Sequence, residues 1–252
     1  MGITTSMMKN ILAPLRTAPR LMWLDIALTI IPALAWYAGV LGRETIITPR
    51  CATDVALCAR ETVHGIDRRV IGMNSGRADG LSFVTQNWSG YLALTAPGIW
   101  VGALAIAGKL TPMGALAAVG TDLVIMAQTV SWNGALNEGA RLIVQRPRPF
   151  VYANPSALGA NPHNYTSFYS GHTSFTAAAT VSLLLTLAGR AAPGIILWLA
   201  GILAAAMIPL TGLFRVLSGR HFISDVCIAA TAGTLIALVI ALLHKRRNRN
   251  SV

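Results

Sequence analysis

The chain has 252 residues, of which 54% are hydrophobic and only 12% are charged. Soluble domains carry charge on about a quarter of their residues, so this composition, with its apolar residues gathered in long blocks, excludes an ordinary soluble domain and indicates one membrane-embedded bundle. The net charge of +11 would suit nucleic acid. Because the basic residues lie at the termini, in connections and beside apolar helices, without interleaved aromatic residues, we expect no nucleic-acid partner.

Taken in chain order, six segments are predicted to cross the bilayer, which requires about 20 apolar residues. They are residues 21–41, 89–107, 112–144, 170–187, 193–213 and 222–243. Lys9, Arg16 and Arg20 precede an apolar block of spanning length, which predicts a first span and not a cleaved signal peptide. The predicted fold is all-α, a six-transmembrane-helix bundle in a single integral membrane domain, 1–252. An extracytoplasmic lobe of loops and short helices, residues 42–88, is expected between spans 1 and 2.

Orientation follows from the basic residues near the predicted spans. Those before the first span and the stretch HKRRN after the sixth both favour the cytoplasm, and an even number of spans puts both termini on one side. We therefore predict a multi-pass protein of the bacterial cytoplasmic (inner) membrane. The connections that then face outside are residues 42–88, 145–173 and 214–221. The last two are rich in arginine, against the orientation rule, which indicates a functional reason for those arginines.

Three cysteines are too few for a disulfide scaffold. Cys51 and Cys58 flank part of a polar connection that is predicted to be outside, where they could form a disulfide. Two unpaired thiols are an equal alternative. Only His64 lies near these cysteines, so no metal site is predicted there.

The first candidate for chemistry is the pattern Arg215, His221 and Asp225 at the entry to the sixth span. Four residues separate His221 from Asp225, so on a helix the two would share a face. The carboxylate could then accept a hydrogen bond from one imidazole nitrogen and leave the other as a nucleophile. The alternative is a buried pair that only holds helices together. An ionisable residue in a span costs about 3 kcal/mol on insertion scales, which favours a function.

A second pattern, Tyr169-Ser170-Gly171-His172, lies at the start of the fourth span. The backbone N–H groups and the positive dipole end of a helix N-terminus form an anion site. Gly171 permits close approach of the backbone, Ser170 offers a hydroxyl group, and His172 could protonate a leaving oxygen. Alternatively, Ser170 is only a helix cap and His172 an interfacial residue.

A third pattern, with Arg141, Arg148 and Pro149, ends the third span. Guanidinium groups match phosphate oxygens in geometry and charge, although these arginines could instead snorkel to lipid headgroups. Arg146 and Arg220 are interpreted as headgroup contacts, with binding of a second phosphate as the alternative. Since all three patterns lie at the outer ends of spans, they can meet in one site that suits phosphoryl transfer. No carboxylate cluster for Mg²⁺ is evident, so arginines would take the place of a metal, and no cofactor is predicted.

Together these patterns resemble the type 2 phosphatidic acid phosphatase superfamily, whose soluble relatives include vanadium-dependent haloperoxidases. The first motif of the family is Lys, six residues, then Arg-Pro, and residues 141–149 match it with Arg in place of Lys. The second is Pro-Ser-Gly-His, and residues 169–172 match it with Tyr in place of Pro. The third is Ser-Arg, five residues, His, three residues, Asp, and residues 214–225 match it with Phe in place of Ser.

The resemblance implies a mechanism and a role for each residue. His221 would attack phosphorus and form a phosphohistidine, Asp225 would orient its ring, and His172 would protonate the leaving alkoxide. The groups implied to hold the phosphate oxygens are Arg141, Arg148, Ser170, Gly171 and Arg215. The implied partner is a lipid phosphate among membrane lipids, either a phosphomonoester or a pyrophosphate: phosphatidic acid, phosphatidylglycerol phosphate, undecaprenyl pyrophosphate or lipid A type.

Other functions stay open at this point. A lipid phosphotransferase would use the same phosphohistidine and pass the phosphoryl group to another lipid. A non-catalytic transporter or binding protein for anionic lipids could present a similar anion site. A haloperoxidase is disfavoured because six spans have no evident use in it. The sequence makes no prediction of the head group or the oligomeric state.

Overall fold

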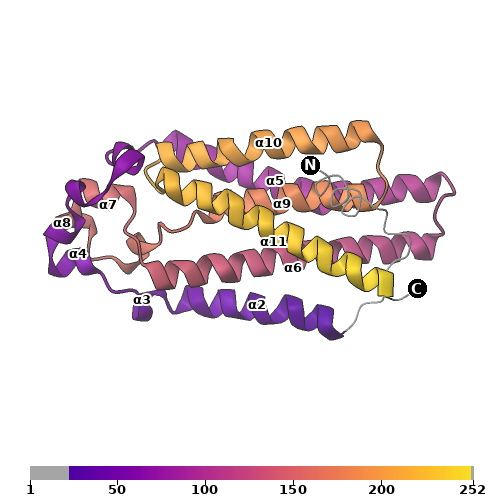
Figure 1. Ribbon diagram of the computed structural model, residues 1–252, viewed down its shortest axis with the longest axis horizontal. Helices are drawn as coiled ribbons and strands as arrows, with labels where there is room; N and C mark the ends of the chain where they lie inside the picture. The colour runs from indigo at the N-terminus through magenta and orange to yellow at the C-terminus, as the bar shows by residue number, and fades with distance from the viewer. Residues whose placement is uncertain (1–22, 251–252) are drawn as a thin grey trace, which may run out of the picture.

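The computed structural model describes residues 23–250, and their side chains as far as Lys245. Six long helices that alternate in direction form a bundle (Figure 1). They are α2 (Trp23–Leu41), α5 (Gly76–Ile106), α6 (Pro112–Val144), α9 (Gly171–Gly189), α10 (Gly194–Leu217) and α11 (Ile223–Asn250). No strand occurs within residues 23–250, so the described chain is all-helical, as predicted.

Five of the helical segments are long and apolar enough to cross a membrane, namely those formed by α2, α5, α6, α10 and α11. The sixth long helix, α9, has 19 residues but is not among them. Threonine or serine occurs in almost every one of its turns. The predicted membrane-embedded bundle therefore has support from five helices, and α9 differs from them in composition.

The position of α9 accounts for that composition. It lies in the middle of the bundle and packs against α5, α6, α10 and α11, and 13 of its 19 residues are buried. Its hydroxyl groups bond to protein, as Thr180 does to the Thr176 carbonyl at 2.8 Å and Thr176 to the Thr211 hydroxyl of α10 at 3.3 Å, so these groups need no water. A Cβ atom at Gly233 would collide with the Ser174 carbonyl oxygen. Glycine at this position therefore allows α9 and α11 to cross in backbone contact.

Short elements cover one end of the bundle, at the left of Figure 1. Before α5 come α3 (Arg43–Ile46), α4 (Arg50–Thr53) and the 3-10 helices η1 (Val55–Cys58), η2 (Arg60–Thr62) and η3 (Gly65–Val70). Between α6 and α9 come α7 (Pro149–Ala153), α8 (Pro155–Leu158) and η4 (Pro162–Tyr165). Because α3 contacts η4 and α4 contacts α8, the two stretches form one unit. We call residues 42–75 and 145–170 the cap.

Cys51 and Cys58 form a disulfide within the cap, with their Cα atoms 5.6 Å apart. This decides between the two alternatives left open by the sequence. Both cysteines belong to an apolar cluster with Val151 and Tyr165. The Tyr165 hydroxyl accepts a hydrogen bond from the Cys51 N–H at 2.9 Å and donates one to the Gly159 carbonyl at 2.6 Å. The cluster therefore joins the two stretches of the cap.

The second long helix begins earlier than predicted. The sequence suggested a span from residue 89, whereas α5 begins at Gly76 and is capped by Ser75, whose hydroxyl accepts from the Ala78 N–H at 3.2 Å. Residues 76–88 are polar, and Ser82 and Thr85 are buried against the rest of the bundle. A search for apolar runs misses such a stretch because Arg77, Asp79 and Gln86 interrupt the apolar pattern. The predicted lobe, 42–88, is thus shortened to residues 42–75.

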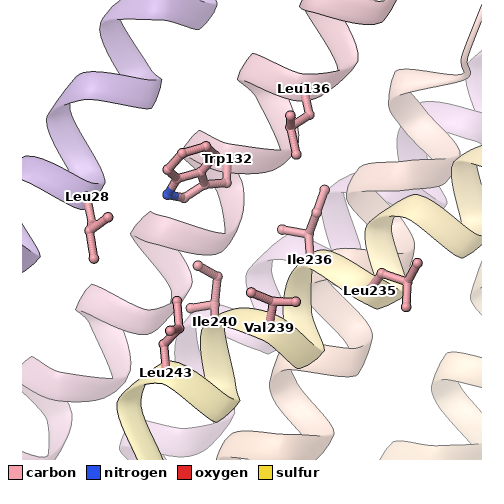
Figure 2. Close-up of a pocket in the computed structure, with 8 residues that line it drawn as sticks. All are labelled: Leu28, Trp132, Leu136, Leu235, Ile236, Val239, Ile240 and Leu243. Carbon is pink, nitrogen blue, oxygen red and sulfur yellow. The ribbon is translucent and has the colours of Figure 1, made fainter. Parts of the chain in front are cut away.

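The outer surface of the bundle is apolar. A groove of about 270 Å³ between α2, α6 and α11 has apolar side chains on every wall. Figure 2 shows Trp132 and Leu136 of α6 across from Ile236 and Ile240 of α11. Exposed apolar surface on this scale is a liability in water and is expected beside lipid chains.

Candidate active site

A cavity of about 310 Å³ lies near the capped end of the bundle. Its walls come from α2, α5, α6, α9 and α10, together with the turns that precede α7 and α11. Six residues singled out from the sequence line it: Arg141, Arg148, Gly171, His172, Arg215 and His221. The three patterns, which are far apart in the sequence, therefore meet in one space.

Unpartnered polar atoms are concentrated on the cavity wall. Arg141, Arg148 and Arg215 each have a buried Nε with no hydrogen-bond partner among the described residues. A buried donor left unsatisfied costs about 1–3 kcal/mol. An anion in the cavity would be bound by the guanidinium groups of these three lining residues, and charge-assisted bonds to arginine are the strong kind. The wall therefore has the properties of an anion site.

Glu138, one turn before Arg141 in α6, holds that arginine in place. Its Oε2 accepts from Arg141 Nη1 at 3.3 Å. The same carboxylate accepts two hydrogen bonds from Arg43 in the cap, one from Nε and one from Nη2. The single negative charge of Glu138 is thus shared by two arginines. Arg141, which lines the cavity, therefore keeps a net positive charge there.

The other two cavity arginines are held differently. Asp79 of α5 accepts from Arg215 at 2.6 Å and from Arg220 at 3.0 Å, so again one carboxylate serves two arginines. This corrects the interpretation of Arg220 as a headgroup contact, because its charge is directed to a carboxylate of a neighbouring helix. Within the described chain, the Arg148 side chain donates to one group, the neutral Thr166 hydroxyl, at 2.9 Å.

The start of α9 is built for close approach to an arginine. A Cβ atom at Gly171 would lie 2.7 Å from Arg141 Nη2, so a larger residue would displace the guanidinium group. Asn137 donates to the Tyr169 carbonyl at 2.7 Å and fixes the turn before the helix. The Ser170 hydroxyl is turned to its own helix and accepts from the N–H three residues on, at 3.4 Å. It serves as a helix cap, and the phosphate contact suggested for it stays a prediction.

His172 follows in the first turn of α9. Phe83 of α5 packs edge-to-face against its ring, with the ring centroids 4.4 Å apart. The Nε2 atom is buried and has no hydrogen-bond partner in the described part of the chain. The ring of His172 therefore lies between an apolar neighbour and the cavity that the residue lines.

His221 is 1% exposed and lies in the turn before α11. Its Nδ1 is 2.6 Å from the carbonyl oxygen of Ser167. Because a carbonyl can only accept, Nδ1 carries the proton and Nε2 keeps its lone pair. Burial, followed by the positive charges of Arg215 and Arg148, holds the pKa of His221 well below its ordinary value. The ring is therefore neutral at physiological pH and nucleophilic at Nε2.

Asp225 is not the acceptor for this ring, which corrects the predicted His–Asp contact. His221 precedes α11, which begins at Ile223, so the helical spacing that would bring the two together does not apply. Asp225 Oδ2 instead accepts from Ser167 Oγ at 2.6 Å and from the Phe222 N–H at 3.0 Å. The carboxylate thus holds the residue whose carbonyl holds the ring.

Arg146 also differs from its interpretation as a headgroup contact. Its Nη1 donates to Asp225 Oδ1 at 2.6 Å, and its Nη2 donates to Asp67 Oδ2 at 2.9 Å. Sequence reasoning missed Asp67, Asp79 and Arg43 as parts of the site. The one signal in the sequence is that residues 42–88 hold nearly as many acidic as basic residues, whereas the connections with the motifs are basic. Within the described chain, no three His, Cys, Asp or Glu side chains are grouped as metal ligands would be.

The comparisons with known proteins agree with the motifs. The profile of one family, described as the PAP2 superfamily, matches residues 122–249, which is half of the chain and contains all three patterns. The chain therefore belongs to the PAP2 superfamily, the type 2 phosphatidic acid phosphatases. Membership suggests a phosphatase-type function on a lipid phosphate in a membrane protein. Comparison with curated proteins and with solved structures returned no match.

Proposed function

We propose that the protein is an integral membrane lipid phosphatase that hydrolyses a phosphomonoester or pyrophosphate lipid through a phosphohistidine on His221, without a metal. The observation that carries the proposal is the shared cavity, where a neutral imidazole lies among three arginines with unpartnered buried N–H groups. A phosphate group offers the acceptors that these donors lack. Fixed positive charge around phosphorus stabilises the transition state of phosphoryl transfer.

In the first step, Nε2 of His221 attacks phosphorus and the bond from phosphorus to the lipid oxygen breaks. The Nδ1–H of the ring stays on the Ser167 carbonyl, so the phosphorylated ring is cationic. His172, in its protonated form, donates its proton to the leaving oxygen, and the lipid departs as an alcohol or, from a pyrophosphate, as a monophosphate. The cavity arginines bind the remaining phosphate oxygens.

In the second step, water attacks the phosphohistidine. His172, now neutral, takes a proton from the water, the phosphorus–nitrogen bond breaks, and inorganic phosphate leaves. The electron pair of that bond returns to Nε2 of His221. Both histidines then have their starting protonation states.

A second hollow supports a lipid as the substrate. A groove of about 500 Å³ between α5 and α6 shares Val130 and Phe175 with the cavity. Its walls are mainly apolar and include Leu94, Leu123 and Met126. A lipid with its phosphate among the arginines can therefore place its chain in this groove.

We further propose that α9 is a sixth span and that the cap faces outside. Because protein surrounds α9 on most sides, it can cross a bilayer with a composition too polar for a lipid-facing helix. The start of α2 and the far end of α11 both lie opposite the cap (Figure 1), and the basic stretch HKRRN favours the cytoplasm for that end. The disulfide in the cap is typical of an oxidising compartment. A bacterial inner-membrane protein would then have its site on the periplasmic side.

Phosphate release by detergent-purified protein tests the proposal. The substrates are short-chain phosphatidic acid, phosphatidylglycerol phosphate and a prenyl pyrophosphate. We expect turnover of at least one of them, and His221→Ala should lower kcat by several orders of magnitude. Retained activity in that variant would remove the mechanism. Transfer of a labelled phosphoryl group from the donor to an acceptor lipid would favour a phosphotransferase. Stable binding of the lipid phosphate without phosphate release would favour a non-catalytic role.

The lipid groove has its own test. Ala127 lines the groove and is exposed, so Ala127→Trp fills part of the groove without disturbing the core. We expect KM for a long-chain lipid phosphate to rise about tenfold, since removing uniform binding raises KM alone. Hydrolysis of p-nitrophenyl phosphate, which has no chain, should be unchanged. An equal effect on both substrates would place the lipid chain elsewhere.

A further inference from the structure

One carboxylate of the cap, Asp67, reaches the residues behind His221. It lies in η3, which contacts α11, and is 8% exposed. It accepts from the Ser224 N–H at 3.0 Å and from Arg146 Nη2 at 2.9 Å. Burial opposes ionisation, but the hydrogen bonds from Ser224 and Arg146 outweigh it and lower the pKa of Asp67. The group is therefore charged at neutral pH.

Arg146 links this carboxylate to the one behind the nucleophile. While Nη2 is bound to Asp67, Nη1 donates to Asp225 Oδ1 at 2.6 Å. The Arg146 Cζ also lies 4.0 Å from the centroid of the Phe222 ring. Two carboxylates and one aromatic face thus fix the plane of the guanidinium group. In addition, the Arg146 carbonyl accepts from the Ser167 N–H at 3.0 Å.

Ser167 completes the series of contacts. Its hydroxyl donates to Asp225 Oδ2 at 2.6 Å, and its carbonyl accepts from His221 Nδ1 at 2.6 Å. Hydrogen bonds therefore run without a break from Asp67 in the cap to the imidazole in the cavity. Ser167 lies between η4 and α9, outside any regular helix, so its carbonyl is positioned by these contacts and by the bond from its own N–H to the Arg146 carbonyl.

We propose that Asp67 is a positioning residue for the nucleophile, because by holding Arg146 it immobilises the Ser167 carbonyl that orients the His221 ring. The inference rests on the proposed function, which makes His221 the nucleophile. A carbonyl can direct an imidazole only if the carbonyl itself stays in place. Misplacing a reacting group by about 1 Å can cost about 100-fold in rate.

Attachment of the cap does not depend on this charge. Val63 and Val70, on either side of Asp67, pack with Phe222 in an apolar cluster that holds η3 against the start of α11. Loss of the charge would therefore leave η3 docked and act mainly on Arg146. Asp67 also lies outside residues 122–249, the part of the chain matched by the family profile.

Asp67→Asn tests the proposal on the rate. The amide keeps the size of the side chain and can still accept from Ser224, but it lacks the charge that pairs with Arg146. We expect kcat for phosphatidic acid to fall by on the order of 10- to 100-fold, with KM within about twofold because the cavity arginines are untouched. Asp67→Glu should regain part of the rate.

The matched control is Asp54→Asn. Asp54 is an exposed carboxylate of the cap that caps η1 by accepting from the Ala56 N–H at 2.9 Å, and asparagine can cap equally well. This variant should keep the wild-type kcat.

A second readout does not depend on turnover. The ¹⁵N shifts of His221, in protein labelled at histidine, report which ring nitrogen carries the proton. The wild type should show the Nδ1–H tautomer, and Asp67→Asn should show a mixture of tautomers. Wild-type kcat, or an unchanged tautomer, in Asp67→Asn would overturn the positioning role. A wild type without phosphatase activity whose tautomer still responds to Asp67→Asn would refute the proposed function and support the positioning role.

Discussion

The two ends of the bundle use buried arginine in opposite ways. Away from the cap, Arg190 donates through Nε and Nη2 to Asp122, with a shortest contact of 2.7 Å, and Nη2 also donates to the Ala118 carbonyl at 2.8 Å. Near the cap, Arg148 and Arg215 each keep a buried Nε that has no partner within the described chain. Both of these residues line the cavity.

This difference separates a structural arginine from a binding one. The donors of Arg190 are directed to α6, so the residue holds the connection between α9 and α10 against that helix. The unpartnered donors of the cavity arginines lower the stability of the empty protein, and binding of an anion by these arginines would offset that loss. Burial and charge are similar at the two ends, so only the hydrogen-bond partners reveal which arginine is free to bind.

The largest expected effect on the rate comes from removing one of the cavity arginines. Arg148→Ala should lower kcat/KM by on the order of 10³ or more, the scale on which an arginine stabilises phosphoryl transfer. The melting temperature in detergent should change little, because the arginine's side-chain partner is the neutral Thr166 hydroxyl. Arg148→Lys should regain only part of the rate, since an ammonium group lacks the planar fork. A loss of less than tenfold in Arg148→Ala would show that the free donors do not mark the site.

Removing the structural arginine, Arg190, should have the reverse result, with stability lost and turnover retained. Arg190→Ala leaves Asp122 buried without its partner and should destabilise the protein by about 3–5 kcal/mol. The folded fraction should keep kcat within a few-fold, as measured by thermal unfolding and by turnover of the same sample. The double variant Arg190→Met with Asp122→Leu removes both charges and should regain most of the stability. Unchanged stability with lost turnover would reverse the assignment.

A smaller effect would sharpen the comparison at Arg141, which is both held by a carboxylate and free at Nε. Glu138→Gln should lower kcat/KM by about tenfold, because a hydrogen bond to a charged group contributes about 1.5–3 kcal/mol and Arg43 shares the carboxylate. Glu44→Gln, in the exposed α3 residue next to Arg43, is the control and should leave kcat/KM unchanged. Equal rates in the two variants would mean that Arg141 needs no support.

The smallest effect concerns His221 and extends the comparison to pH. Its pKa is far below the ordinary value in the folded protein and about 6.5 in the unfolded chain. The unfolded state therefore gains a proton first, and stability falls below about pH 6.5 by at most about 1.4 kcal/mol per pH unit. His221→Gln should flatten this dependence in thermal unfolding, whereas the control His64→Gln, at an exposed position of the cap, should not. A wild-type slope in His221→Gln would contradict the low pKa.

Apolar runs predicted the helices well where the segments are long and apolar throughout. The third predicted span, 112–144, coincides with α6, and the first predicted span begins within a few residues of α2. The start of α5 was wrong because Arg77, Asp79 and Gln86 make that stretch polar, and its polar residues Asp79 and Gln86 face the arginines and the cavity. The predicted partner of His221 was wrong because His221 lies before the first residue of α11, Ile223, so it does not share a helical face with Asp225.

By itself the sequence determined the all-helical class, the family and the motif side chains on which the proposed function rests, since these depend on residue type and on spacing along one segment. Only the tertiary structure decided which partners hold those side chains. Arg215 pairs with Asp79 across 136 residues and His221 with Ser167 across 54. Such contacts arise when helices pack, and no local period in the chain encodes them.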